Sequence, residues 1–287
     1  MLTYVNIVAA GLLTGCVYGL MALGLSVIFG VIRIVNFAHG EMMVVAMYGA
    51  LFLNQRLGLD PFVVMPVVAA GLFLAGYALQ RGLINRYIGR PEHQQFLLLL
   101  AVSIILTSST LMAFGPDARS VQLDYAYDSF EIGGLLVDKA RVLAALGAAT
   151  GAAALWVFFR FTRIGKSIRA CADNQVGAQV VGLDVKRLYA VTFGIGAACV
   201  GVAGTLLLLL VDVQPYIAAD YTLLAFTIVI VGGLGSMPGA LLGGILVGVS
   251  EALSGFIIMP SLKSLFSFAL LIVVLLVRPQ GLMGRRA

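Results

Sequence analysis

The sequence predicts an all-α, polytopic membrane protein that forms a single transmembrane permease-like domain over residues 1–287. Hydrophobic residues make up 61% of the chain and charged residues only 11%, against about 25% charged in soluble domains. Apolar stretches long enough to cross a bilayer recur along the whole length, separated by short polar segments. A chain of this composition cannot present a water-soluble surface, so we expect about eight to ten transmembrane helices.

The expected spans follow from the apolar stretches in chain order. They cover roughly residues 5–30, 36–54, 62–80, 96–114, 141–159, 188–211 and 264–277. The stretch 221–262 holds one ionisable residue, Glu251, and must cross twice or enter and return. No charged segment precedes the first apolar run, so we expect a retained span there and not a cleaved signal peptide.

Charge sets the expected orientation. Lysine and arginine gather in three polar segments: Arg81, Arg86 and Arg90; Arg160, Arg163, Lys166, Arg169, Lys186 and Arg187; and Arg278, Arg285 and Arg286. The segment 115–140 is net acidic, and the stretch around Asp212 and Asp220 has no basic residue. Because basic loops stay in the cytoplasm, we expect an external N-terminus and a cytoplasmic C-terminus. The net charge of +5 thus reflects orientation, and nucleic-acid binding is disfavoured.

Glycines at every fourth position predict close helix packing. The spacing occurs at Gly11, Gly15 and Gly19 and in the pairs Gly147–Gly151, Gly239–Gly243 and Gly244–Gly248. It places glycines on one helix face, where backbones can approach closely, which matters because lipid gives helices no hydrophobic reason to associate.

The run NFAHGE at 36–41 places polar groups inside apolar sequence. The apolar or small residues from Met42 to Leu53 would span roughly 18 Å as a helix, well short of the ~30 Å hydrocarbon core. The span must therefore begin near Asn36, with His39 and Glu41 at membrane depth or at its inner edge.

Two roles remain open for this run, and they are compatible. Glu41 suits the first turn of a helix, where a carboxylate favours the helix dipole. Ionisable groups in a membrane also face protein or a water-filled cavity, which makes Asn36, Phe37, His39 and Glu41 candidates for a substrate path.

A second interruption reads GGLGSMPG at 232–239, after an apolar run of about half a membrane thickness. Glycines and proline break a helix. A broken backbone at membrane depth is tolerated where it is buried in protein or lines a cavity, so Gly232, Gly233, Gly235 and Pro238 are further candidates for the path. A simple connecting turn is the alternative.

The basic segment 160–187 fits two short amphipathic helices in the cytoplasm. The first covers Gly165–Ala172; the second follows a cap at Asp173 or Asn174 and is stopped by Gly182 after about Val181. Such an element typically contacts a soluble partner or lipid headgroups.

Catalytic and metal chemistry find no support in the sequence. The motif GKS at 165–167 has Arg160 where a nucleotide-binding loop needs glycine. His39 and His93 lie far apart, which argues against a metal site. The cysteines Cys16, Cys171 and Cys199 are scattered and suggest no disulfide framework. We therefore expect neither an enzyme nor a bound metal. The interior also lacks the paired acidic residues of a proton relay, which disfavours a stand-alone channel or secondary carrier.

Four segments, in order, resemble the permease subunits of branched-chain amino acid ABC importers, most closely the LivH type. They are IVNFAHGEMMVVAMYGA at 34–50, SIRACADNQVGAQVVGLDV at 167–185, IVGGLGSMPGALLGGILVGVSEAL at 230–253 and VRPQGLMG at 277–284. Together they extend over nearly the whole chain.

The resemblance implies one subunit of a heteromeric importer in the bacterial inner (plasma) membrane. Its partners would be a LivM-type second permease, two ATPase subunits that hold ATP and Mg, and an extracytoplasmic substrate-binding protein. This chain would need no cofactor and would import branched-chain or other small apolar amino acids by alternating access. Urea and short-chain amide importers share these motifs and remain the alternative.

The resemblance also implies that the loop 160–187 couples the permease to its ATPase. The matching positions are Arg169, Ala170, Asn174, Ala178 and Gly182. The family loop often carries a second alanine or a Pro-Glu pair after the asparagine, where this chain has Gln175, Val176 and Gly177.

The charge asymmetry generates a direct test of orientation. Single cysteines at Gln122 and Gln175 are expected to react with a membrane-impermeant thiol reagent from opposite sides, because the basic segment stays inside. Labelling of both from the same side of intact vesicles would contradict this topology.

Overall fold

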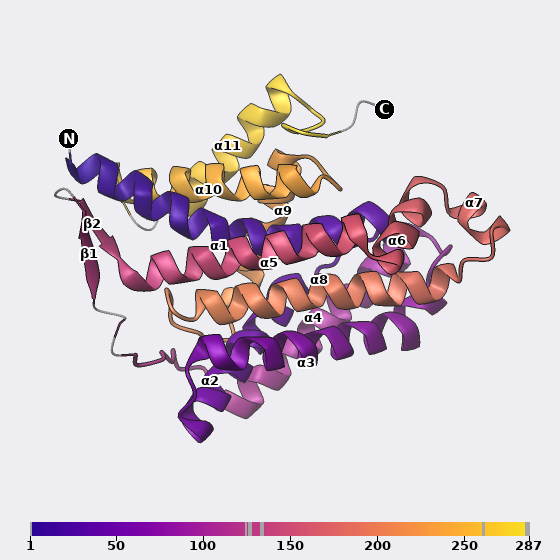
Figure 1. Cartoon of the computed structure of the whole chain (residues 1–287), viewed down its shortest axis with the longest axis horizontal. Coiled ribbons are helices and arrows are strands. Elements are labelled where there is room, and N and C mark those ends of the chain that lie inside the picture. The colour runs from indigo at the N-terminus through magenta and orange to yellow at the C-terminus, as the bar shows by residue number, and fades with distance from the viewer. Residues whose placement is uncertain (1, 124, 126–127, 133–134, 260–261, 285–287) are drawn as a thin grey trace.

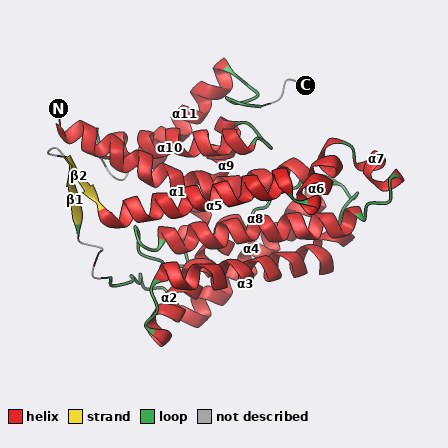
Figure 2. Cartoon of the chain, viewed as in Figure 1, coloured by secondary structure: helices red, strands yellow, loops and turns green. Residues whose placement is uncertain are grey.

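A computed structural model describes residues 2–123, 125, 128–132, 135–259 and 262–284. Over these residues the chain is a bundle of long helices lying side by side, with a small two-stranded sheet at one end (Figure 1). Helices form almost all of the regular structure (Figure 2), which confirms the expected all-α membrane fold.

The long helices match the expected spans. They are α1 (Leu2–Ile32), α2 (His39–Leu57), α3 (Pro61–Gly82), α4 (Glu92–Phe114), α5 (Lys139–Phe161), α8 (Val185–Leu207), α9 (Ile217–Gly232), α10 (Met237–Ile257) and α11 (Lys263–Val277). Short elements complete the chain: a 3-10 helix η1 (Ile84–Arg86), α6 (Arg163–Asp173), α7 (Gln175–Val180), and strands β1 (Ser129–Ile132) and β2 (Leu135–Asp138). Within the described residues, six helices are long and apolar enough to cross a membrane, and α9 and α11 are shorter apolar helices.

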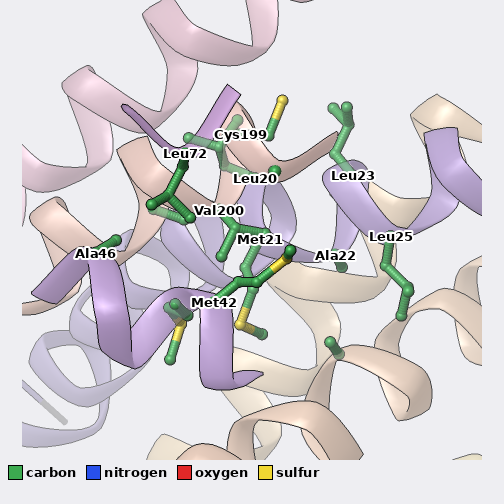
Figure 3. Packing of buried hydrophobic residues seen from close by; sticks show 14 of the residues in the cluster. Leu20, Met21, Ala22, Leu23, Leu25, Met42, Ala46, Leu72, Cys199 and Val200 are labelled. Carbon is green, nitrogen blue, oxygen red and sulfur yellow. The ribbon is translucent and has the colours of Figure 1, made fainter. Parts of the chain in front are cut away.

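The centre of the bundle is formed by α1 and α8. The most apolar windows of these two helices are 72% and 78% buried, whereas that of α4 is only 17% buried. Figure 3 shows part of the core, where side chains of α1 lie among those of α2, α3 and α8. The outer helices expose large apolar side chains, such as Met112 at 88%, as a lipid-facing surface requires.

The regularly spaced glycines of α1 lie where α1 packs against α10. A Cβ atom built at Gly248 would lie 2.5 Å from the Cα of Gly15, and one at Gly15 would lie 2.7 Å from the Cα of Ile245. The two helices therefore pack backbone against backbone, as the spacing predicts. On α5, Gly147 instead accommodates the side chain of Leu206.

The segment 115–140, expected to be a loop, also contains a β-hairpin. β1 pairs with β2 in antiparallel register, with Ser129 opposite Asp138. The strands are four residues long, too short to give a clear alternating pattern in the sequence.

The loops expected outside the membrane gather at the hairpin end of the bundle. Arg119 and Val213 exchange backbone hydrogen bonds of 2.9 and 2.8 Å. The Tyr125 hydroxyl donates to Asp60 at 2.8 Å. Burial and this carboxylate raise the pKa of Tyr125, so the phenol stays protonated and remains a donor. Asp124, which we counted in the acidic segment, lies outside the described residues.

The loops expected in the cytoplasm gather at the opposite end (Figure 1). The Asn85 side chain donates to the backbone carbonyl of Lys186 at 3.2 Å, which joins the loop after α3 to the first turn of α8. The basic residues Arg285 and Arg286 lie outside the described residues.

The α1–α10 contact generates a prediction about stability. Gly248→Ala is expected to lower the stability by about 1–3 kcal/mol, because the added methyl group overpacks a backbone contact. The matched control is Gly71→Ala on the exposed face of α3, where a Cβ atom would meet nothing within 4 Å. The measurement is thermal unfolding in detergent. Equal Tm values for the two variants would contradict the close packing.

Candidate functional site

The first break in the helices, between α1 and α2, turns back into the bundle. α1 ends at Ile32, and Arg33 adopts a positive φ of 60° that redirects the chain. The Nε2 of His39, the first residue of α2, lies 3.0 Å from the carbonyl oxygen of Met21. Met21 lies eleven residues before the end of α1, which is about 16 Å of helix rise. Residues 33–38 therefore run back alongside α1, and α2 begins deep inside the bundle.

Glu41 links the first turn of α2 to two other helices. The residue is 5% exposed, and its carboxylate accepts hydrogen bonds from Ser103 of α4 at 2.6 Å and from Thr222 of α9 at 3.2 Å. The hydroxyl of Thr222 in turn accepts from the backbone N–H of Gly40 at 2.9 Å. Ala38, the residue before α2, has no side-chain group that could cap the helix. The hydroxyl of Thr222, which is distant in sequence, caps it instead.

Asn36 and Phe37 complete this junction. Asn36 is fully buried, and its side-chain oxygen accepts from the backbone N–H of Ala38 at 3.1 Å, which shapes the turn into α2. The ring of Phe37 lies 4.7 Å from that of Phe96 on α4 and 5.2 Å from that of Phe226 on α9. Aromatic and polar contacts thus connect the same three helices.

Glu41 lies in the first turn of α2, and it and Phe37 make structural contacts there. Both carboxylate oxygens of Glu41 are engaged, and the ring of Phe37 is packed between helices. His39 is fully buried, and its Nδ1 has no hydrogen-bond partner among the described residues. That these residues line a substrate path stays a prediction.

The second break takes the form of the connecting turn that the sequence left as an alternative. Gly233 and Gly235 have φ values of 107° and 78°, which suit glycine. Ser236 caps α10 by accepting from Gly239 at 3.1 Å, and Pro238 occupies its first turn. Gly232 ends α9.

The C-terminal segment completes this turn. The backbone N–H groups of Leu282 and Met283 donate to the carbonyl oxygens of Val231 and Gly232, both at 2.9 Å. These carbonyls at the end of α9 would otherwise lack partners. The final segment VRPQGLMG therefore ties the end of the chain to the α9–α10 turn.

Side chains cap both short helices, and Asn174 is one of the two caps that the sequence offered for α7. Thr162 accepts from Gly165 at 3.0 Å at the start of α6, and Asn174 accepts from Gly177 at 2.8 Å at the start of α7. Gly182, with a φ of 83°, follows the end of α7. α6 is slightly longer than expected, and α7 ends one residue early, at Val180.

The structure places the five expected coupling residues on this element. Arg169, Ala170, Asn174 and Gly182 are exposed, and Ala178 is buried. The sequence reasoning missed a second feature, an uncovered apolar surface formed by Val176, Val180 and Val181, which are 70%, 81% and 75% exposed. Cys171 on α6 is buried, unlike these valines, and burial raises the pKa of its thiol. We therefore interpret Cys171 as a residue that packs α6 and not as a reactive thiol.

No group of three or more His, Cys, Asp or Glu side chains that could hold a metal ion occurs among the residues that the structure describes. The residues that reasoning from the sequence did not find are Ser103 and Thr222. A hydroxyl in an apolar helix is common and gives no signal of its own.

The Glu41 junction generates a prediction about stability. Glu41→Leu is expected to lower the stability by about 1–3 kcal/mol, since the buried hydroxyls of Ser103 and Thr222 lose their acceptor and Thr222 also caps α2. Glu41→Gln keeps one acceptor oxygen and the shape, so its loss is expected to be smaller. Glu92→Leu is the control, because Glu92 occupies the first turn of α4 and is exposed. Thermal unfolding in detergent measures all three, and equal effects of Glu41→Leu and Glu92→Leu would contradict the role of the junction.

Comparison with known proteins assigns the chain to a family. The family described as "Branched-chain amino acid transport system / permease component" matches residues 7–275. The high-affinity branched-chain amino acid transport system permease protein LivH of Salmonella typhimurium is 34% identical, over 96% of this chain and 94% of LivH. The corresponding protein BraD of Pseudomonas aeruginosa is 30% identical, over 98% of this chain and 96% of BraD. The permease protein LivM of Escherichia coli is 26% identical, over 93% of this chain and 68% of LivM. This chain therefore belongs to the family of permease components of branched-chain amino acid transport systems.

Proposed function

We propose that this chain is one of two permease subunits of an ATP-driven importer that moves branched-chain amino acids into the cytoplasm by alternating access. Family membership and the names of the relatives support the substrate class and favour it over urea or short-chain amides. The similarity to LivM supports a second, related permease as partner. The observation that supports the mechanism most is the α6–α7 element.

The α6–α7 element is suited to contact a soluble ATPase subunit. Capped helices hold its shape, and Arg169 offers a charge for docking. Val176, Val180 and Val181 expose an apolar surface at the end of the bundle, which marks a protein interface when it is contiguous. ATP and Mg would be held by the ATPase subunits and not by this chain.

Movement of α6–α7 would act on several spans at once. α5 leads directly into α6, and α7 is followed by α8. α8 packs along the length of α3, and the Gln80–Asn85–Lys186 hydrogen bonds, of 3.0 and 3.2 Å, hold the loop after α3 to the start of α8. A displacement of the element is therefore transmitted to α5, α8 and α3 together.

The charge distribution supports the orientation. Because basic residues gather in α6–α7 and near the C-terminus, both would lie in the cytoplasm of a bacterium. The hairpin end then faces outward, where an extracytoplasmic substrate-binding protein delivers the amino acid.

The test is coupling in the assembled importer. Arg169→Glu reverses the docking charge. Asn174→Pro removes both the cap of α7 and the backbone hydrogen bond from Asn174 to Ala170. Both variants are expected to abolish leucine uptake and the stimulation of ATP hydrolysis by loaded binding protein. Arg56→Glu, at the exposed end of α2 on the opposite side of the bundle, is the control for charge reversal. Wild-type uptake in both loop variants would contradict the proposal.

A further inference from the structure

A hollow of about 500 Å³ lies between α5, α1 and the start of α10, and it is here called the α5 hollow. Ala149 and Ala153 of α5, Leu23 of α1 and Ile245 of α10 are among the residues that line it, and none of the described residues in its wall is charged. Ala149 and Ala153 are exposed, so the hollow opens on the surface of the bundle. In a membrane this surface is covered by lipid or by another protein chain.

An aromatic and basic cluster borders the α5 hollow at the end nearest to α6. Trp156, the single tryptophan of the sequence, forms the last part of the α5 wall. The Cζ of Arg160, one turn further along α5, lies 5.0 Å from the ring centre of Trp156 and 5.7 Å from that of Phe161. Both rings are exposed. Exposed tryptophan is typical of the level of the lipid headgroups, so Arg160 is held where headgroups lie.

The guanidinium of Arg160 is available to an anion. A cation–π contact holds its charge without using its N–H donors. The two ion pairs among the described residues both lie at the hairpin end, and neither involves Arg160. The sequence from 140 to 172 contains no aspartate or glutamate, whereas Arg163 and Lys166 follow at the start of α6 and are exposed. This end of α5 therefore presents several cations and no acidic residue of its own.

The hollow and the cation lie in register along α5. Ala149, Ala153, Trp156 and Arg160 follow one another at intervals of four, three and four positions, which places them on one face of the helix. Ala149 and Arg160 are eleven residues apart, which is about 16 Å of helix rise. One leaflet contributes half of the ~30 Å hydrocarbon core. An acyl chain in the hollow would thus reach from the middle of the bilayer to a headgroup at Arg160.

We propose that the α5 hollow and Arg160 form a binding site for an anionic phospholipid of the leaflet next to α6. One acyl chain fills the hollow. The phosphate accepts hydrogen bonds from the guanidinium of Arg160, and the charges of Arg163 and Lys166 attract the anionic headgroup. The site goes beyond the proposed function, because binding of a lipid here requires neither the transported substrate nor ATP. Figure 1 shows α5 leading into α6 at the end of the bundle opposite the hairpin, where the headgroup would lie.

The chemistry of the site favours a phospholipid over other occupants. A zwitterionic amino acid needs an acceptor for its ammonium group, and the wall of the hollow offers no carboxylate among the described residues. The apolar side chains of a second permease could cover the hollow, but they would have no use for the cation at its rim. A phospholipid uses both parts, because its acyl chain is apolar and its phosphate is anionic.

Trp156 allows a direct test in the purified full-length chain. Because it is the single tryptophan, the fluorescence of the chain reports on the wall of the hollow. The probe is phosphatidylglycerol with brominated acyl chains, which quench tryptophan on contact, and phosphatidylcholine with the same chains is the comparison. In mixed detergent micelles, half-maximal quenching is expected at a mole fraction about tenfold lower for phosphatidylglycerol, since basic residues near the surface favour the anionic headgroup.

Two substitutions separate the headgroup from the acyl chain. Arg160→Gln is expected to raise the mole fraction of phosphatidylglycerol for half-maximal quenching about tenfold, the effect of losing a charge-assisted hydrogen bond. Arg56→Gln is its matched control, because Arg56 also lies over a ring, that of Phe52 at 5.6 Å, but on the opposite side of the bundle. Ala153→Leu fills the hollow and is expected to weaken quenching by both lipids. Its control is Ala154→Leu, an exposed neighbour outside the wall.

Each result supports or overturns one part of the site. Equal quenching by the two lipids, or an unchanged titration of Arg160→Gln, would overturn the headgroup site. Equal titrations of Ala153→Leu and Ala154→Leu would overturn the acyl chain in the hollow. In the assembled importer, native mass spectrometry is expected to show phosphatidylglycerol bound to the wild type and lost from Arg160→Gln. Equal retention there would mean that a partner subunit covers the hollow. None of these measurements depends on uptake, so failure of the proposed function would leave them unaffected.

Discussion

The placement of α2 depends on the buried carboxylate of Glu41. A chain that re-enters a membrane protein leaves unpaired backbone groups at the start of its next helix, and no water is present in lipid to satisfy them. Here Thr222 accepts from the N–H of Gly40 while Thr222 and Ser103 both donate to Glu41. One acidic side chain thereby fixes α2, α4 and α9 relative to one another and allows α2 to begin beside Met21, eleven residues before the end of α1.

The two sides of α1 differ in how closely they are packed. One side meets α2 and α8 in the filled core, and the glycines of α1 bring α10 into backbone contact. Between α1, α5 and the start of α10, a cavity of about 500 Å³ remains, lined on α5 by Ala149 and Ala152 and also by Trp156.

Much of this arrangement could be predicted from local sequence. The interruption at NFAHGE could be predicted from an apolar run too short to span a bilayer. The sequence also indicated a helix start at Asp173 or Asn174 and a helix stop at Gly182, from the chemistry of these residue types. The partners of Glu41 could not be predicted, because Ser103 and Thr222 are 62 and 181 positions away. The hairpin was missed because its strands are short.

Hydrogen exchange in lipid nanodiscs tests most directly whether α2 begins inside the bundle under the control of Glu41. The amides of residues 40–44 are expected to exchange as slowly as those in the middle of α8. Thr222→Val, which removes the hydroxyl but keeps the shape, is expected to speed exchange there and to leave α8 unchanged. Exchange of residues 40–44 in the unmodified chain as fast as that of α7 would contradict the buried start of α2.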